Sequence, residues 1–240
     1  MFAIIEELQD NGQMGVTELS DILGMSKGSI HHHLTTLQEH DYVVKQDGKY
    51  TIGLEFFSIG VGTRNRYPIY EAAKNELPKL ASQTGETAWC MVEENGKGVF
   101  IDGYVSGASL NPDAVIGNKT PLHCNSAGKT ILANLPEEQR EAIIGRNELE
   151  RMTENTITDP EQLRQELKQI REQGYSMNLE EDISGIHAVG TAILDKDSKV
   201  LGSISIGGTA TRLTEKYCEQ ELVPALNATA NDIELNITYR

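Results

Sequence analysis

Hydroxyl, imidazole and ammonium groups follow one another at helical spacing between residues 26 and 36, and side chains of these kinds contact DNA. One face of the predicted helix is apolar, at Ile30, Leu34 and Leu37. The opposite face holds His32 and Thr35 beside the small Gly28, so hydrogen-bonding groups there reach base edges without a steric clash. The candidate DNA contacts on this segment are Ser26, Lys27, Ser29, His31, His32, Thr35 and Thr36.

Two helices separated by a tight turn are expected to position this face. Thr17 is a candidate N-cap for the first helix, and Gly24 ends that helix and supplies the turn. Ser26 is a candidate N-cap for the second helix. Lys27 then lies in the first turn of the second helix, where its ammonium group is able to reach a phosphate.

A hairpin is expected to follow. Short β-prone runs at 42–45 and 49–52 flank Asp47-Gly48, a dipeptide that favours a two-residue hairpin turn. Helix, turn, helix and hairpin together describe a winged helix-turn-helix, which places its second helix in the major groove of DNA. The hairpin adds two candidate DNA-binding residues, Lys45 and Lys49.

The charge of the chain argues against this interpretation when taken alone. The whole chain carries a net charge of −15, and residues 1–53 carry −5, from three lysines and eight carboxylates. A basic patch is the usual footprint of a nucleic-acid binder. Two explanations remain open: all three lysines lie on the second helix and the hairpin, where the local field is positive, or the protein works in high salt, which screens repulsion from phosphate.

Other parts of the sequence resemble functional motifs but lack the residues or the spacing that such sites require. The simplest interpretation of the three consecutive histidines at 31–33 is that they lie on a solvated helix surface without a special role. They cannot share a metal, because consecutive helical residues do not face one another. Gly128-Lys129 resembles part of a phosphate-binding loop, but His123 occupies the place of the required first glycine. Three widely spaced cysteines exclude a disulfide framework and a zinc knuckle. We therefore expect no metal and no cofactor.

A thiol–imidazole pair is the remaining catalytic hypothesis. His123 and Cys124 are neighbours, but at the end of a strand neighbouring side chains point to opposite faces. A distant histidine such as His187 could still meet Cys124. We expect no catalytic residue.

A helix that starts at Asn125-Ser126 and runs through Leu135 offers unpaired backbone N–H groups to a carboxylate or a phosphate. The small residues there, Ala127 and Gly128, let a ligand approach closely. The alternative is an ordinary capped helix without a ligand.

The remaining pattern predicts an α+β chain in three parts. We expect a winged helix-turn-helix DNA-binding domain at 1–53, a linker helix at 54–68 and an effector-binding domain at 69–240, with a strand-rich centre between helices. The apolar linker helix either contacts a second copy of the chain or packs on its own winged helix. No run of 18 apolar residues and no signal peptide is present, so we expect a soluble, cytoplasmic protein without membrane contacts.

Several stretches of the sequence resemble those of a known protein family. Residues 121–133 (PLHCNSAGKTILA), 180–190 (EEDISGIHAVG) and 202–208 (GSISIGG) look like the effector-domain signatures of IclR-type transcriptional regulators. Residues 25–37 (MSKGSIHHHLTTL) look like their recognition helix, and 153–159 with the acidic balance is similar to the haloarchaeal branch. The resemblance implies a winged helix, a linker helix and a C-terminal GAF-like effector domain with a central antiparallel sheet. It also implies homodimers or homotetramers.

The same resemblance implies an effector pocket. Its positions fall near Leu122, His123, Ser126, Ala127, Gly128, Asn178, Ile186, Ala188, Ser205 and Gly207. Members often carry an acidic residue at the place of Asn178, a cysteine at the place of Ala188 and a second serine at the place of Gly207. The effector of another member is therefore not transferable to this chain.

These observations predict a transcription regulator that binds a palindromic operator in double-stranded DNA under the control of a small, acidic metabolite. Two alternatives from other classes stand beside it. One is a ligand-binding or scaffolding protein whose winged helix contacts protein rather than DNA, and the other is a Cys124-dependent enzyme. The effector, the operator, the sign of regulation and the choice between dimer and tetramer stay open.

Overall fold

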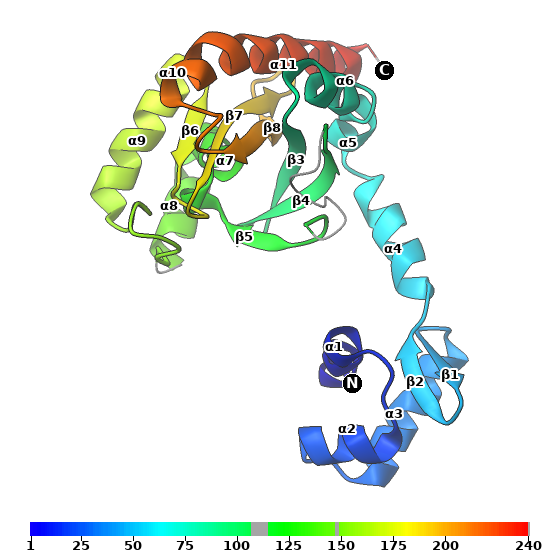
Figure 1. The fold of residues 1–240 in the computed structure, drawn as a ribbon. Helices are drawn as coiled ribbons and strands as arrows, with labels where there is room; N and C mark the ends of the chain where they lie inside the picture. Colours follow the sequence, from blue (N-terminus) through cyan, green and yellow to red (C-terminus); the bar gives the residue numbers. More distant parts are fainter. Residues whose placement is uncertain (107–114, 147–148, 240) are drawn as a thin grey trace. The chain divides into compact units, whose positions relative to one another are not determined.

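The computed structural model describes residues 1–106, 115–146 and 149–239. The chain forms two compact units, Met1–Arg66 and Tyr67–Arg240 (Figure 1).

The first unit consists of helices followed by a hairpin and a further helix. Its elements are α1 (Phe2–Asn11), α2 (Val16–Leu23), α3 (Lys27–Glu39), β1 (Val43–Gln46), β2 (Lys49–Ile52) and α4 (Glu55–Arg64). The predicted apolar stripe of α3 is buried in the core of this unit, together with Leu19, Val43 and Tyr50. The opposite face of α3 is thereby left to solvent.

The helix starts obey capping rules with one departure from the prediction. The hydroxyl of Ser26 accepts the backbone N–H of Ser29 at 3.2 Å, which confirms the predicted N-cap of α3. The prediction for α2 was wrong, because its N-cap is Gly15 rather than Thr17. The carboxylate of Glu18 accepts the N–H of Gly15 at 2.6 Å, and this bond fixes the start of the helix two residues earlier.

The predicted hairpin is present. Gln46 pairs with Lys49, so only Asp47 and Gly48 form the turn. Both have positive φ, 50° for Asp47 and 81° for Gly48. A turn with two positive φ angles matches the right-handed twist of the strands, and an Asp-Gly dipeptide adopts it readily.

Helix α4 and its N-cap residue Leu54 expose apolar side chains. Leu54 is 84% exposed, Phe57 is 70% exposed and Ile59 is 45% exposed. No residue of α4 is buried. Exposed apolar side chains of this size favour contact with another apolar surface.

The second unit is built on one antiparallel sheet. Within the described residues this sheet has six strands in the order β5-β4-β3-β8-β7-β6. The strands are β3 (Thr87–Glu94), β4 (Lys97–Tyr104), β5 (Lys119–Pro121), β6 (Ser176–Leu179), β7 (Ile186–Leu194) and β8 (Val200–Thr209).

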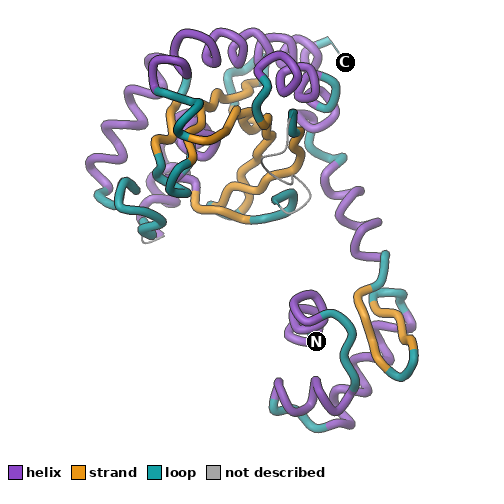
Figure 2. Tube along the Cα trace, viewed as in Figure 1, coloured by secondary structure: helices purple, strands orange, loops and turns teal. Residues whose placement is uncertain are grey.

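Helices cover both faces of this sheet (Figure 2). One face packs on α5 (Pro68–Ala73), α6 (Glu76–Thr84) and the C-terminal α11 (Val223–Thr238). The other face packs on α7 (Ser126–Asn134), and α7 in turn packs on α9 (Pro160–Gln173). The remaining helical elements are η2 (Leu122–Cys124), α8 (Glu137–Arg146), α10 (Glu215–Tyr217) and a π-turn at Cys218–Leu222. No helix within the described ranges is long and apolar enough to cross a membrane.

Sequence analysis missed one helix of this unit and misplaced one short turn. Helix α8 was not predicted, because only Leu135 and Pro136 separate it from α7. His123 and Cys124 lie in the helical turn η2 rather than at the end of a strand, so the argument from strand alternation does not apply to them.

Candidate DNA-reading and ligand-binding sites

The polar residues predicted to contact DNA lie on α3, on its N-cap and on the hairpin. Ser26, Lys27, His31, His32, Lys45 and Lys49 are exposed, and Ser29, Thr35 and Thr36 are partly exposed. The fold therefore keeps all nine of them accessible, while the apolar stripe of the same helix is fully buried.

The two threonines of α3 use their hydroxyl protons within the helix. Thr35 Oγ1 donates to the carbonyl oxygen of His31 at 2.9 Å, and Thr36 Oγ1 donates to that of His32 at 3.2 Å. A hydroxyl group has one proton and two lone pairs. Each threonine therefore presents only acceptor capacity to an outside partner.

The three lysines of the first unit have different surroundings. Lys49 Nζ lies 3.3 Å from a carboxylate oxygen of Glu18, which partly neutralises it. The N–H of Gly15 and the ammonium of Lys49 lower the pKa of Glu18. Lys45 Nζ lies 5.2 Å from the centre of the Tyr50 ring. Lys27 and Lys45 have no ion pair among the described residues, so they are the lysines left for phosphate.

The sheet brings four of the predicted effector residues into two adjacent cross-strand rows. Strand pairing aligns Thr87, Gly207, Ala188 and Asn178 in one row. The next row on the same face contains Trp89, Ser205, Gly190 and Ser176. Gly207 and Ala188 are the smallest residues of the first row, and they separate the longer side chains at its ends.

The start of α7 lies directly on the second row. A Cβ on Gly190 would come within 2.9 Å of the carbonyl carbon of Ser126, so only glycine permits this approach. Ser176 Oγ donates to the carbonyl of Ser126 at 2.6 Å. A Cβ on Gly128 would lie 2.3 Å from the carbonyl oxygen of Leu122, so Gly128 lets the turn before the helix pack closely.

Some amide groups at this helix start remain available. The side chain of Asn125 accepts the N–H of Gly128 at 2.8 Å and caps the helix. The N–H groups of Ser126 and Ala127 have no acceptor within the described part of the chain. Together with the helix dipole, two such groups favour a carboxylate.

Sequence reasoning missed the other four residues of these rows, among them Thr87 and Trp89 on β3. The indole Nε1 of Trp89 lies 3.9 Å from where a Cβ on Gly207 would lie, and its N–H has no acceptor among the described residues. Trp89 is 93% buried, being 7% exposed, and Ser205 is 4% exposed. The signal that could have found them is the alternation of Thr87, Trp89 and Met91 along one strand.

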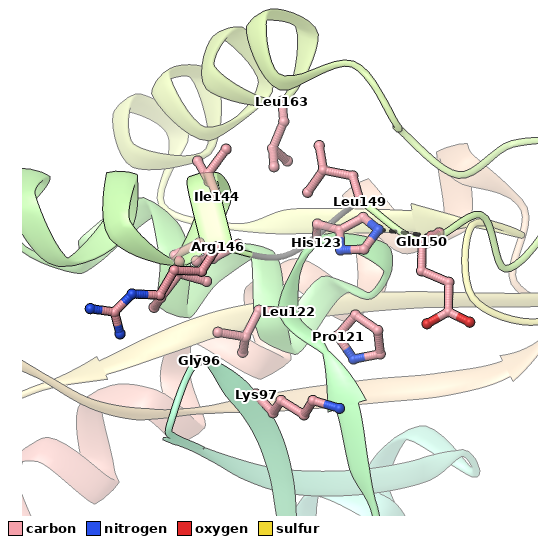
Figure 3. Close-up of a pocket in the computed structure, with 12 residues that line it drawn as sticks. Gly96, Lys97, Pro121, Leu122, His123, Ile144, Arg146, Leu149, Glu150 and Leu163 are labelled. Carbon is pink, nitrogen blue, oxygen red and sulfur yellow. Dashed lines mark hydrogen bonds between the residues drawn. The ribbon is translucent and has the colours of Figure 1, made fainter.

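Asn178 and three other predicted residues have surroundings of their own. Asn178 Oδ1 accepts the N–H of Glu181 at 2.7 Å, so this side chain shapes the turn after β6. Leu122 and His123 line a separate cavity of about 320 Å³ beside α8 and α9 (Figure 3). The last predicted residue, Ile186, pairs with Thr209 at the end of β7.

Buried charges lie behind the helix start. Lys129, which is 0% exposed, places its ammonium 2.6 and 2.8 Å from the two carboxylate oxygens of Glu181 and 3.2 Å from Glu166. Burial raises the pKa of Glu181, and Lys129 opposes this effect. The ammonium is thus occupied by partners inside the protein.

The thiol of Cys124 has no imidazole partner in the described structure. Cys124 Sγ lies 3.3 Å from the carbonyl of Pro121 and 3.6 Å from Asp182 Oδ1. Burial and the nearby Asp182 raise the pKa of Cys124 to about 12. His187 Nδ1 instead lies 2.6 Å from the carbonyl oxygen of Leu213. A thiol held protonated in this way is a poor nucleophile.

Comparison with known proteins agrees with this architecture. Residues 1–47 match the family described as "IclR helix-turn-helix domain", and residues 62–235 match "Bacterial transcriptional regulator IclR C-terminal". The chain is 32% identical over 238 residues to the "Probable HTH-type transcriptional regulator ArcR" of Halobacterium salinarum, covering 98% of this chain and 90% of that protein. It is 30% identical over 211 residues to the "Transcriptional repressor IclR" of Escherichia coli, covering 86% of this chain and 77% of the relative.

Solved structures agree as well. The crystal structure of the Thermotoga maritima IclR superimposes with a TM-score of 0.86 at 31% identity, covering 99% of this chain and 97% of that one. The C-terminal domain of Escherichia coli KdgR gives a TM-score of 0.64 at 28% identity, covering 72% of this chain and 99% of that domain. With an N-terminal helix-turn-helix and a C-terminal α+β domain around a curled antiparallel sheet, this chain belongs to the IclR family of transcriptional regulators.

Proposed function

We propose that this chain regulates transcription by binding a palindromic operator in double-stranded DNA, and that a small acidic metabolite controls the binding. The observation that carries the proposal is the division of α3 into a buried apolar stripe and an accessible polar face. A helix that exposes His32 and Thr35 at the end of a tight turn has the form of a DNA-reading helix. The hairpin β1–β2 acts as the wing, with Lys45 beside the DNA backbone.

The metabolite binds on the sheet face next to the start of α7, in a GAF-like domain. The N–H groups of Ser126 and Ala127 receive its carboxylate, and the indole N–H of Trp89 and the hydroxyl of Ser205 are further donors. Because Lys129 is occupied by Glu181 and Glu166, the carboxylate is held by neutral donors rather than by a lysine. Gly207 and Ala188 leave space for the body of the ligand.

The chain acts as a homodimer or homotetramer. The exposed apolar side chains of α4, in the linker helix at 54–68, are the surface that a second copy covers. A two-fold dimer presents two α3 helices, which fits a palindromic operator. The acidic composition and the similarity to a Halobacterium salinarum relative support membership in the haloarchaeal branch.

Selection of bound fragments from genomic DNA tests the proposal. The full-length protein should enrich a small number of palindromic sites, and His32→Ala/Thr35→Ala should lose them while keeping its fold. Gln13→Ala, a change in the first unit away from α3, is the matched control. A protein that enriches no sequence, and instead pulls down another protein through the same α3 face, would favour the scaffolding alternative.

The Cys124-dependent enzyme is the weaker alternative. Its thiol is buried, protonated and without a histidine in the described structure. Cys124→Ala should retain both operator binding and the metabolite response, and no reaction product should appear. Loss of a measurable turnover in this variant would revive the enzyme hypothesis.

A further inference from the structure

The cavity beside α8 and α9 is distinct from the sheet face proposed for the metabolite. It measures about 320 Å³ and lies between the β3–β4 turn, η2, the end of α8 and α9 (Figure 3). None of Ser126, Ala188, Ser205 and Gly207 lines it. This volume is near the lower end of the range that is typical of small-molecule pockets. A cavity of this size holds about ten water molecules or a ligand of similar size.

Six apolar side chains form part of the cavity lining, beside polar and charged groups. They are Leu122, Leu132, Ile143, Ile144, Leu149 and Leu163. Side chains of this type bind the hydrocarbon part of a ligand, because apolar surface leaves water when the two meet. These six side chains therefore favour a ligand that has an aliphatic part.

His123 supplies one acceptor to this cavity. Its Nε2 lies 3.0 Å from the carbonyl oxygen of Glu150, so the proton is on Nε2, which donates to that oxygen (Figure 3). Burial lowers the pKa of His123, so the ring is neutral and Nδ1 keeps a lone pair. His123 is 97% buried, being 3% exposed, and Nδ1 has no partner among the described residues.

The rim of the cavity is more basic than the chain as a whole. Two cations, Lys97 and Arg146, and one carboxylate, Glu150, are among the lining residues of a chain whose net charge is −15. Lys97 lies across the rim beside Pro121, whereas the guanidinium of Arg146 points away (Figure 3). No ion pair of Lys97 occurs in the described part of the structure. Lys97 is therefore the cation available to a ligand.

We propose that this cavity is a second small-molecule site, which takes an aliphatic monocarboxylic acid of about six carbons. The carboxylate pairs with Lys97 at the rim, and the hydrocarbon chain lies against Leu132, Ile144 and Leu163. A hydroxyl on the chain would donate to Nδ1 of His123, so hydroxy acids bind better than the plain acids.

Titration of the full chain, labelled at the Ile and Leu methyl groups, with hexanoate tests this proposal. A ligand of this size binds with a Kd on the order of 1 mM. The methyl signals of Leu132, Ile144 and Leu163 should shift, while Trp89 fluorescence, which reports on the sheet face, should not change. Shifts confined to the sheet face, or no shifts up to ~10 mM, would overturn the proposal.

Two variants distinguish the contribution of the Lys97 charge to binding from that of the cavity space. Lys97→Glu, at an exposed position, should weaken hexanoate binding about two- to fivefold, the range of one solvent-exposed ion pair, and should leave 1-hexanol unaffected. Leu149→Trp, at the partly exposed rim, should abolish the binding of both. Lys196→Glu carries the same charge change outside the cavity and should bind normally. Equal binding of hexanoate to Lys97→Glu and the unaltered chain would exclude the carboxylate assignment.

Discussion

The ammonium group of Lys129 lies 2.6 Å from a carboxylate oxygen of Glu181, although the two residues are 52 positions apart in the sequence. Lys129 belongs to α7, and Glu181 belongs to the segment between β6 and β7. The pair therefore joins the helix that carries the proposed carboxylate site to the turn beside that site. Lys129 is fully buried, so its charge depends on this partner.

Lys129→Met should destabilise the second unit by about 3–5 kcal/mol, because it leaves Glu181 buried without its cation. The unfolding free energy measured in urea reports this loss. Glu181→Gln should also destabilise the chain, and the double variant should lose less than the sum of the two single variants. Strictly additive losses would mean that the two groups do not stabilise one another.

Asp182 should make stability depend on pH in an unusual direction. Burial raises the pKa of Asp182 above the ordinary value of 3.8. At a pH between these two pKa values, the folded chain therefore holds a proton that the unfolded chain has lost. By linkage, the contribution of Asp182 to the unfolding free energy falls as the pH rises from 3.8 through the raised pKa. Urea unfolding of the unaltered chain and of Asp182→Asn over this range should differ, with the fall absent in the variant. Parallel profiles would show that Asp182 titrates normally.

Gly207→Val should remove the metabolite response. The added Cβ meets Ala188 Cβ at 3.6 Å, an ordinary contact, so the strand tolerates the change while the space beside Trp89 is filled. Gly207→Ala adds less and should weaken the response only partly. Trp89 is the single tryptophan of the chain, so its fluorescence measures binding directly in a metabolite screen. A full fluorescence change with Gly207→Val would place the metabolite elsewhere.

His32→Ala/Thr35→Ala should lower operator affinity without unfolding the first unit. A good bidentate contact contributes roughly 1–3 kcal/mol of base discrimination, and the loss here should lie near the lower end because these groups are short. Titration of a labelled operator, with circular dichroism as the check on folding, measures the effect. Unchanged affinity would mean that another face of α3 reads the bases.

Operator binding should depend weakly on salt. Each phosphate contact normally gives a slope of ~0.9 in the logarithmic salt dependence, but Lys49 is paired with Glu18, and eight carboxylates of residues 1–53 repel phosphate. Cations taken up between these carboxylates and the DNA offset the release of counterions. Useful affinity should persist above ~1 M KCl, where the screening length is about 3 Å. A steep, monotonic loss of affinity with KCl would contradict this expectation.

The local features of the first unit were predictable because neighbouring residues determine them. The cap at Ser26, the apolar stripe of α3 and the Asp47-Gly48 turn each depend on a few consecutive side chains. The start of α2 was misplaced because Glu18 reaches back to the backbone of Gly15, a contact that competes with the hydroxyl of Thr17.

The sheet face was predictable only in part. The resemblance of local motifs made Asn178, Ala188, Ser205 and Gly207 candidate pocket residues, and strand pairing places them in two adjacent rows. Trp89 was missed because its place on the face follows from the pairing of β3 with β8, which lie far apart in the sequence. Pairing between distant strands is decided by packing of the whole sheet, and local alternation indicates only which residues share one face of a strand.

The hydroxyl protons of Thr35 and Thr36, which are donated to the carbonyls of their own helix, restrict what α3 is able to read. Each threonine offers a lone pair outward, and in the major groove the partners of a lone pair are the exocyclic amino groups of adenine and cytosine. Guanine and thymine present a carbonyl oxygen at the corresponding position, and this oxygen cannot donate a hydrogen bond to the hydroxyl lone pair. If α3 reads the operator as proposed, the positions beneath the two threonines should follow the amino–keto division of the bases rather than the purine–pyrimidine division.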